Sequence, residues 1–222
     1  DWSPALWALA VVTMIVGNLA AVTQRNIKRM LAYSSIGQAG YILVAVVAAD
    51  SPRRDVADAA VQGVLFYLLA YTFMNLGAFA VVIALARAGH ERLDLNSDYA
   101  GLARRHPYLA GALALFMLSL GGIPPTAGFI AKLTVFRAAV AAGYWPLALV
   151  GVVTSMIALA FYLRVIIQMY TRETTAVEEA PRRVPAPLAV VLTICIVVTL
   201  QMGILPALPL DWAQQALFVV AR

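Results

Sequence analysis

Six long segments of this sequence contain no Asp, Glu, Lys or Arg, and they constrain the fold more than any other feature. They are residues 2–24, 30–49, 59–86, 107–131, 138–163 and 184–210. A helix needs about 20 predominantly apolar residues to cross the roughly 30 Å hydrocarbon core of a bilayer. Lipid offers backbone groups no hydrogen-bond partners, so such segments must be helical. We therefore expect an all-α, polytopic transmembrane helix bundle with six spans, forming a single transmembrane domain over residues 1–222.

The expected span boundaries follow from these segments. We place the spans at residues 5–22, 30–49, 59–86, 107–142, 145–170 and 186–206. The last stretch, 207–220, mixes Asp and Gln with Leu and Phe, which is typical of a short interfacial helix. Hydrophobic residues make up 63% of the sequence and charged residues 12%, whereas soluble domains average about 45–50% and 25%. This composition excludes a disordered chain and an ordinary soluble enzyme.

Lysine and arginine are divided unequally between the two sets of connections. Eleven lie in alternate connections that face one side of the membrane, and three face the other. The eleven are Arg25, Lys28, Arg29, Arg87, Arg92, Arg104, Arg105, Arg164, Arg172, Arg182 and Arg183, and the three are Arg53, Arg54 and Arg222. Short connections rich in Lys and Arg stay in the cytoplasm. We therefore expect a multi-pass protein of the cell inner (plasma) membrane, with the 87–106 loop cytoplasmic and both ends outside.

The net charge of +5 does not indicate a nucleic-acid partner. The basic residues occupy short connections and form no stripe interleaved with aromatic side chains. The partner that the sequence predicts is the lipid bilayer, with no nucleic acid. The chain begins at Asp1 directly before an apolar run, without Met or a basic signal-peptide region. A processed terminus or a fragment would explain this start, and we favour a fragment of a longer protein.

The segment 107–142 is too long for one straight crossing, because 36 residues at about 1.5 Å each would span roughly 54 Å. In its middle, residues 121–125 read Gly-Gly-Ile-Pro-Pro. Pro124 and Pro125 each lack a backbone N–H, and the glycines weaken the helix further. The sequence therefore predicts two half-helices joined at membrane depth. Such a break is tolerated where it is buried in protein or lines a wet cavity, a recurring device in ion transporters.

Lys132 follows the break by seven residues, about two helical turns. A lysine near the membrane centre costs about 2.5–3.5 kcal/mol on insertion scales and usually marks an ion path. Burial favours the neutral amine, which makes such a lysine a proton acceptor and donor near neutral pH. The alternative, a side chain that extends to the interface, fits Arg137 better because it lies closer to the end of the span. Lys132 is thus the first candidate for proton transfer.

Two further stretches place polar side chains at helical spacing. Lys28 begins the second span and is either a proton-transfer residue or a loop anchor. After it, Ser34, Gln38 and Tyr41 share one helix face, with Ser35 on its flank. In the third span the stripe is Tyr67, Tyr71 and Asn75. Such stripes either hold water and relay protons or join helices by hydrogen bonds worth about 0.6–2 kcal/mol each. The pattern leaves both interpretations open.

The sequence predicts no cofactor and no metal in this chain. Its single cysteine, Cys195, lies in the last span, and His90 and His106 lie in the cytoplasmic loop without carboxylate or thiol partners at ligand spacing. The spans contain no His, Asp or Glu. No dinucleotide-binding, phosphate-binding or nucleophile-elbow motif is present either.

Two motifs carry a resemblance to a known family. Residues 26–41, NIKRMLAYSSIGQAGY, resemble the signature stretch of the antiporter-like subunits of respiratory complex I. Residues 118–132, LSLGGIPPTAGFIAK, are similar to the second broken helix of the same subunits. In the larger subunits, L and M, the third span carries two histidines and a lysine where this chain has Tyr67, Tyr71 and Asn75. That departure resembles the subunit N branch and speaks against a histidine relay.

The resemblance implies a subunit of NADH:quinone oxidoreductase with fourteen spans, of which this chain would be roughly the last six. It implies a proton half-channel in which Lys28 and Lys132 carry protons, with Lys132 serving the exit to the outside. Ser34, Ser35, Gln38, Tyr67, Tyr71 and Asn75 would form a polar relay, and Pro124 and Pro125 the helix break. Partners would be other membrane subunits, K, M and neighbours. NADH, FMN, iron–sulfur clusters and quinone would belong to partner subunits.

Two other interpretations stay open from the sequence. The same helices serve the homologous subunit of a multisubunit Na⁺/H⁺ antiporter or of a membrane-bound hydrogenase. A purely structural membrane module that moves no protons is the third interpretation. The structural module predicts that Lys132 can become Leu or Met without loss of function.

Overall fold

A computed structural model describes residues 2–86, 94–172 and 184–220, and the described chain is all-helical apart from an isolated bridge between Asn26 and Asp94. The helices are α1 (Ser3–Val22), α2 (Ile27–Ala48), α3 (Arg54–Leu85), α4 (Leu102–Arg105), α5 (Pro107–Gly121), α6 (Ala127–Ala141), α7 (Trp145–Thr171), α8 (Ala186–Ile204) and α9 (Ala207–Val220). This confirms the all-α class. Outside these ranges lie Arg87, His90, Arg92, Arg182, Arg183 and Arg222.

Five helices in the described ranges, α1, α2, α3, α7 and α8, are long and apolar enough to cross a membrane, and α5 is a shorter apolar helix. Local residues explain where several of them begin. Proline occupies the first turn of α1, α5, α7 and α8, where its fixed φ suits a helix and its missing N–H costs nothing. At α2 the Asn26 side chain accepts a hydrogen bond from Arg29 N at 3.1 Å, a typical N-cap.

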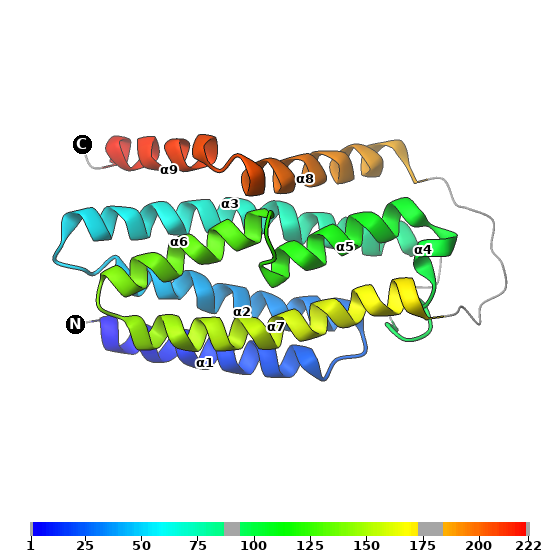
Figure 1. Ribbon diagram of the computed structural model, residues 1–222, viewed down its shortest axis with the longest axis horizontal. Coiled ribbons are helices and arrows are strands. Elements are labelled where there is room, and N and C mark those ends of the chain that lie inside the picture. The colour runs from blue at the N-terminus through cyan, green and yellow to red at the C-terminus, as the bar shows by residue number, and fades with distance from the viewer. Residues whose placement is uncertain (1, 87–93, 173–183, 221–222) are drawn as a thin grey trace.

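The long helices run along a common axis, as Figure 1 shows. The α1–α2 turn, α4 and the end of α7 lie at one end of the bundle, and the α2–α3 and α6–α7 turns lie at the other. At the first end, Arg164 of α7 donates to the carbonyl oxygens of Val22, at 3.0 Å, and of Gln24. The connections rich in arginine that the structure describes therefore gather at one end, as the charge alternation predicts.

Small residues let α1 and α2 pack closely. A Cβ atom added to Gly17 would lie 2.5 Å from the backbone nitrogen of Gly37, and one added to Gly40 would lie 2.8 Å from that of Met14. Close backbone approach through small residues is the usual way that helices associate in lipid. The opposite face of α1 exposes Leu9, Val12, Val16 and Leu19, each more than half exposed. That outer surface is apolar, as a membrane span requires.

The short C-terminal helix that the sequence predicts is present as α9. It lies beside the N-terminal part of α3 (Figure 1), where Gln62 Nε2 donates to the carbonyl oxygen of Leu210 at 2.8 Å. The first turns of α3 carry Arg54, Asp55 and Asp58. Helix α9 therefore lies beside the charged end of α3. Its interfacial role stays a prediction.

Candidate functional site

The site begins at the interruption between α5 and α6. Helix α5 ends at Gly121, and Gly122 ends the helical geometry with a φ of +84°, a conformation that glycine adopts without strain. The chain becomes helical again at Ala127, after Thr126 in extended geometry. The structure thus confirms the predicted break. Figure 1 shows the two half-helices of 15 residues each in succession along the bundle.

The two prolines leave two backbone carbonyls without their helical partners. In an α-helix the carbonyl of one residue accepts from the N–H four residues later. Pro124 and Pro125 are four residues after Leu120 and Gly121, and proline has no N–H to donate. Lys132 supplies the missing donors, because its Nζ lies 3.1 Å from each of these carbonyl oxygens. The lysine therefore completes the end of α5.

The third partner of the lysine comes from α7. Lys132 Nζ donates to Ser155 Oγ at 2.8 Å, so all three donors of an ammonium are used. The Tyr41 ring lies with its centroid 5.0 Å from Nζ, within the range of a cation–π contact. The C-terminus of α5 adds partial negative charge. Lys132 is only 6% exposed, and its described contacts include no carboxylate, so oriented dipoles hold the ammonium.

A cavity of about 260 Å³ opens beside this lysine between α6 and α7. Lys132 and Ser155 are its only polar side chains among the described residues. The full lining is Gly121, Gly122, Phe129, Lys132, Leu133, Phe136, Val152, Ser155, Met156 and Leu159. Because a water occupies about 30 Å³ in the liquid, the cavity has room for several waters at the ammonium.

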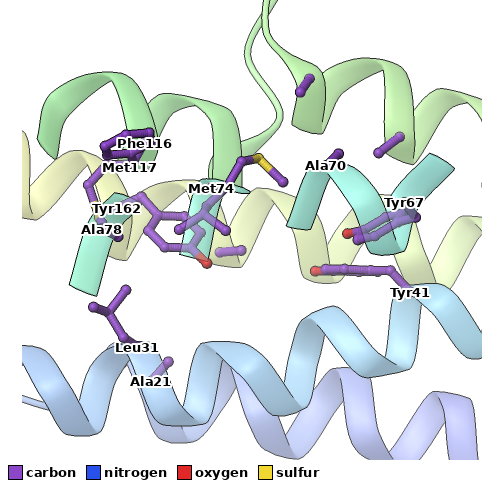
Figure 2. Packing of buried hydrophobic residues seen from close by; sticks show 14 of the residues in the cluster. Ala21, Leu31, Tyr41, Tyr67, Ala70, Met74, Ala78, Phe116, Met117 and Tyr162 are labelled. Carbon is purple, nitrogen blue, oxygen red and sulfur yellow. The ribbon is translucent and has the colours of Figure 1, made fainter. Parts of the chain in front are cut away.

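A second polar cluster surrounds Gln38, which is 2% exposed. Its Oε1 accepts from the Tyr67 hydroxyl, and its Nε2 donates to the Tyr162 hydroxyl and to the carbonyl oxygen of Leu120, both at 3.2 Å. The hydroxyls of Ser34 and Tyr162 share a further hydrogen bond. Figure 2 shows Tyr67 and Tyr162 among the buried apolar side chains of the bundle. The cluster is fully satisfied, as buried polar groups require, and it meets the lysine at the Leu120 carbonyl.

The remaining residues predicted for the site are not all brought together. Tyr71 donates to Ser35 Oγ at 2.7 Å, and Ser35 donates to the carbonyl oxygen of Leu31, so these two form a separate pair. Asn75 is half-buried and takes no part in the side-chain network of the described residues. Lys28 lies half-buried in the first turn of α2, ten residues or about 15 Å of helix from Gln38.

Sequence reasoning missed three groups of this site. Ser155 and Tyr162 lie seven residues apart in α7, about two helical turns, so helical spacing places them on one face and could have found them. Asn18 of α1 donates to the Tyr41 hydroxyl at 3.0 Å and was inconspicuous. The free carbonyls of Leu120 and Gly121 could have been predicted from the sequence. Each lies four residues before a proline, which has no N–H to donate to it.

Cysteine, histidine and carboxylate side chains are the remaining groups that could serve a metal or redox role. Cys195 is buried in α8 at 1% exposure. Within residues 2–86, 94–172 and 184–216, no group of three or more His, Cys, Asp or Glu could hold a metal ion. Arg137 is exposed near the end of α6, as expected for a side chain that reaches the interface.

Comparisons with known proteins point to one family of membrane proteins. The family model described as NADH:quinone oxidoreductase/Mrp antiporter, TM, matches residues 1–158. The chain is 47% identical to NADH-quinone oxidoreductase subunit N 2 of Roseiflexus castenholzii over 214 residues, which are 96% of this chain and 42% of that protein. The curated relatives are longer throughout, and this chain spans between 38% and 43% of the first three.

Two solved structures share the fold. A chain of respiratory complex I from Thermus thermophilus with bound aureothin matches with a TM-score of 0.76 and 35% identity, covering 94% of this chain and 45% of that chain. A chain of the Mrp complex from Dietzia sp. DQ12-45-1b matches with a TM-score of 0.84 and 25% identity, covering 97% and 47%.

Replacing Lys132 tests whether the ammonium completes the end of α5. In the full-length subunit, Lys132→Met leaves the Gly121 carbonyl without this donor and the Leu120 carbonyl with Gln38 Nε2 alone, and an unsatisfied buried group costs about 1–3 kcal/mol. We expect a lower thermal unfolding midpoint in detergent than for Arg137→Met, a control on the exposed side of the same helix. Adding Pro124→Ala and Pro125→Ala returns two backbone donors and should restore part of the loss. Equal midpoints for Lys132→Met and Arg137→Met would contradict this assignment.

Proposed function

This chain belongs to the NADH:quinone oxidoreductase/Mrp antiporter transmembrane family, and we propose that it forms the carboxyl-side proton half-channel of a subunit N of NADH:quinone oxidoreductase. The observation that carries the proposal is Lys132, buried at a helix break and held by two carbonyls and a serine. The 47% identity to a subunit N protein supports the choice of complex. The membrane partners would be subunits K, M and neighbours, and NADH, FMN, iron–sulfur clusters and quinone would be bound by partner subunits.

Lys132 is suited to gain and lose a proton where it lies. The carbonyls and the α5 terminus stabilise the ammonium, whereas burial favours the neutral amine. Because these effects oppose one another, movement of a neighbouring charge can shift the balance toward release of the proton. Ser34, Gln38, Tyr67 and Tyr162 would order water on the cytoplasmic side of the lysine, and Lys28 would receive protons at the start of α2.

The same proposal assigns the membrane topology. Helices α5 and α6 together make one crossing, because each has 15 residues and about 22 Å of length. With α1, α2, α3, α7 and α8 this gives six spans in one domain. The end of the bundle with the α1–α2 turn and α4 faces the cytoplasm under the positive-inside rule. The break and Lys132 then lie inside the bilayer, with α6 leading outward.

Two other functions are each favoured by one observation. The likeness to a chain of the Mrp complex supports a subunit of a multisubunit Na⁺/H⁺ antiporter. The completion of α5 by Lys132 supports a structural module, in which the lysine serves only to satisfy two carbonyls. The two roles of the lysine are separable, because arginine also donates hydrogen bonds but does not deprotonate in proteins.

We expect Lys132→Arg in the full-length subunit, within its intact complex, to assemble and yet lower proton pumping by about tenfold or more. Proton pumping and quinone reductase activity should be measured side by side in membrane vesicles, with assembly followed on native gels. Arg137→Lys on the same helix is the matched control and should leave pumping unchanged. Wild-type pumping by an assembled Lys132→Arg variant would support the structural module instead.

The proposed topology is tested by cysteine labelling in intact cells. Pro52→Cys lies in the α2–α3 turn, and Ser97→Cys lies in the segment before α4, and both positions are exposed. An impermeant thiol reagent should label position 52 and spare position 97 until the cells are opened. The native Cys195 is buried and serves as the background. Labelling of position 97 alone in intact cells would mean the opposite orientation.

A further inference from the structure

The three hydrogen-bond partners of Lys132 differ in whether they can donate a hydrogen bond to it as well as accept one. The carbonyl oxygens of Leu120 and Gly121 only accept hydrogen bonds, whereas the hydroxyl of Ser155 both donates and accepts. An ammonium offers three donors and matches this set in its protonated form. A neutral amine offers two donors and one lone pair. The carbonyls can keep the two donors, and among these partners only Ser155 can donate to the lone pair.

Ser155 therefore lets the site stay satisfied in both protonation states. Rotation of its O–H bond reverses the hydrogen bond between Ser155 Oγ and Lys132 Nζ without moving either heavy atom. A buried amine whose lone pair lacked a partner would cost about 1–3 kcal/mol. The serine removes this penalty from the neutral state. The carbonyls cannot do the same, because they carry no proton.

Ser155 lies beside both Lys132 and the cavity. It lines the cavity of about 260 Å³ between α6 and α7 and is half-buried there. The Gln38 cluster, in contrast, shares with Lys132 the carbonyl oxygen of Leu120. The Leu120 carbonyl carries no proton, so among the three partners of Lys132 only the Ser155 hydroxyl can exchange one directly, and Ser155 lines the cavity.

We propose that Ser155 is the relay residue through which Lys132 exchanges its proton with water in the α6–α7 cavity. In the release step an Nζ–H bond of Lys132 breaks and an Oγ–H bond of Ser155 forms. The original Ser155 proton passes at the same time to a cavity water. The lysine is left neutral, the serine hydroxyl is regenerated with its O–H turned toward Nζ, and the excess proton leaves as hydronium. This inference rests on the proposed function of Lys132.

Three substitutions at position 155 separate a relay from a simple hydrogen-bond partner. Ser155→Thr keeps the hydroxyl and should keep pumping within about twofold of wild type, on the scale of a conservative change. Ser155→Ala removes the hydroxyl and should lower pumping about tenfold or more. Ser155→Asn keeps a donor and an acceptor for Lys132, but an amide does not pass protons on, so pumping should fall as far as in Ser155→Ala.

The experiment uses the full-length subunit in its intact complex, with proton pumping measured in membrane vesicles and assembly on native gels. Thr193→Ala on α8 is the control, because this exposed threonine donates only to its own helix, at Ala189 O. Pumping by Ser155→Ala at the wild-type rate would overturn the proposal. So would pumping by Ser155→Asn at that rate, because Ser155 would then only hold the amine. Equal loss in Ser155→Thr and Ser155→Ala would also overturn it, since the hydroxyl would not matter.

The Lys132→Arg variant in the same series distinguishes failure of the function proposed for Lys132 from failure of the relay role proposed for Ser155. If Lys132→Arg pumps normally, the proposed function itself fails. If Lys132→Arg is inactive while Ser155→Ala and Ser155→Asn pump normally, only the assignment of Ser155 fails. If either Ser155 variant assembles poorly, the assembled fraction is purified and pumping is expressed per complex. Pumping per complex in Ser155→Thr and in Ser155→Asn then still decides whether Ser155 relays a proton or only forms a hydrogen bond with Lys132.

Discussion

The hydrogen bonds from Lys132 to the carbonyls of Leu120 and Gly121 hold the centre of this protein together. Two prolines create the need for these bonds, since neither can donate to the preceding turn. In lipid no water would satisfy the carbonyls. A buried lysine in turn needs acceptors, because a charge at membrane depth costs about 2.5–3.5 kcal/mol on insertion scales. The break and the lysine are each unfavourable alone and satisfy one another together.

Around Lys132 and the helix break, apolar side chains lie on the outer face of the bundle and polar side chains meet in its interior. Glycines bring α1 and α2 into backbone contact, and apolar side chains cover the outer face of α1. The polar side chains of α2, α3 and α7 meet inside, at Gln38, Tyr67 and Tyr162. The Leu120 carbonyl accepts from both Gln38 and Lys132, so the lysine and the inner cluster share one hydrogen-bond acceptor.

Much of this architecture could be predicted from the sequence. The charge-free segments located the five described helices that are long and apolar enough to cross a membrane, and the Gly-Gly-Ile-Pro-Pro stretch located the break, because both effects act along the chain. Contacts between helices were beyond such reasoning, since they depend on how each helix is rotated about its axis. Helical spacing placed Tyr67, Tyr71 and Asn75 in one stripe, yet Tyr67 bonds to Gln38, Tyr71 bonds to Ser35, and Asn75 joins neither. Ser155 shares one face of α7 with Tyr162, two helical turns away, but that spacing does not reveal its contact with the lysine.

The most direct test of this account is an experimental structure of the full-length subunit in lipid, at a resolution that shows side chains and ordered water. The account predicts that Lys132 Nζ lies within hydrogen-bonding distance of the carbonyl oxygens of both Leu120 and Gly121, with Ser155 as its third partner. A lysine that points away from the end of α5, with both carbonyls bound to other donors, would contradict it.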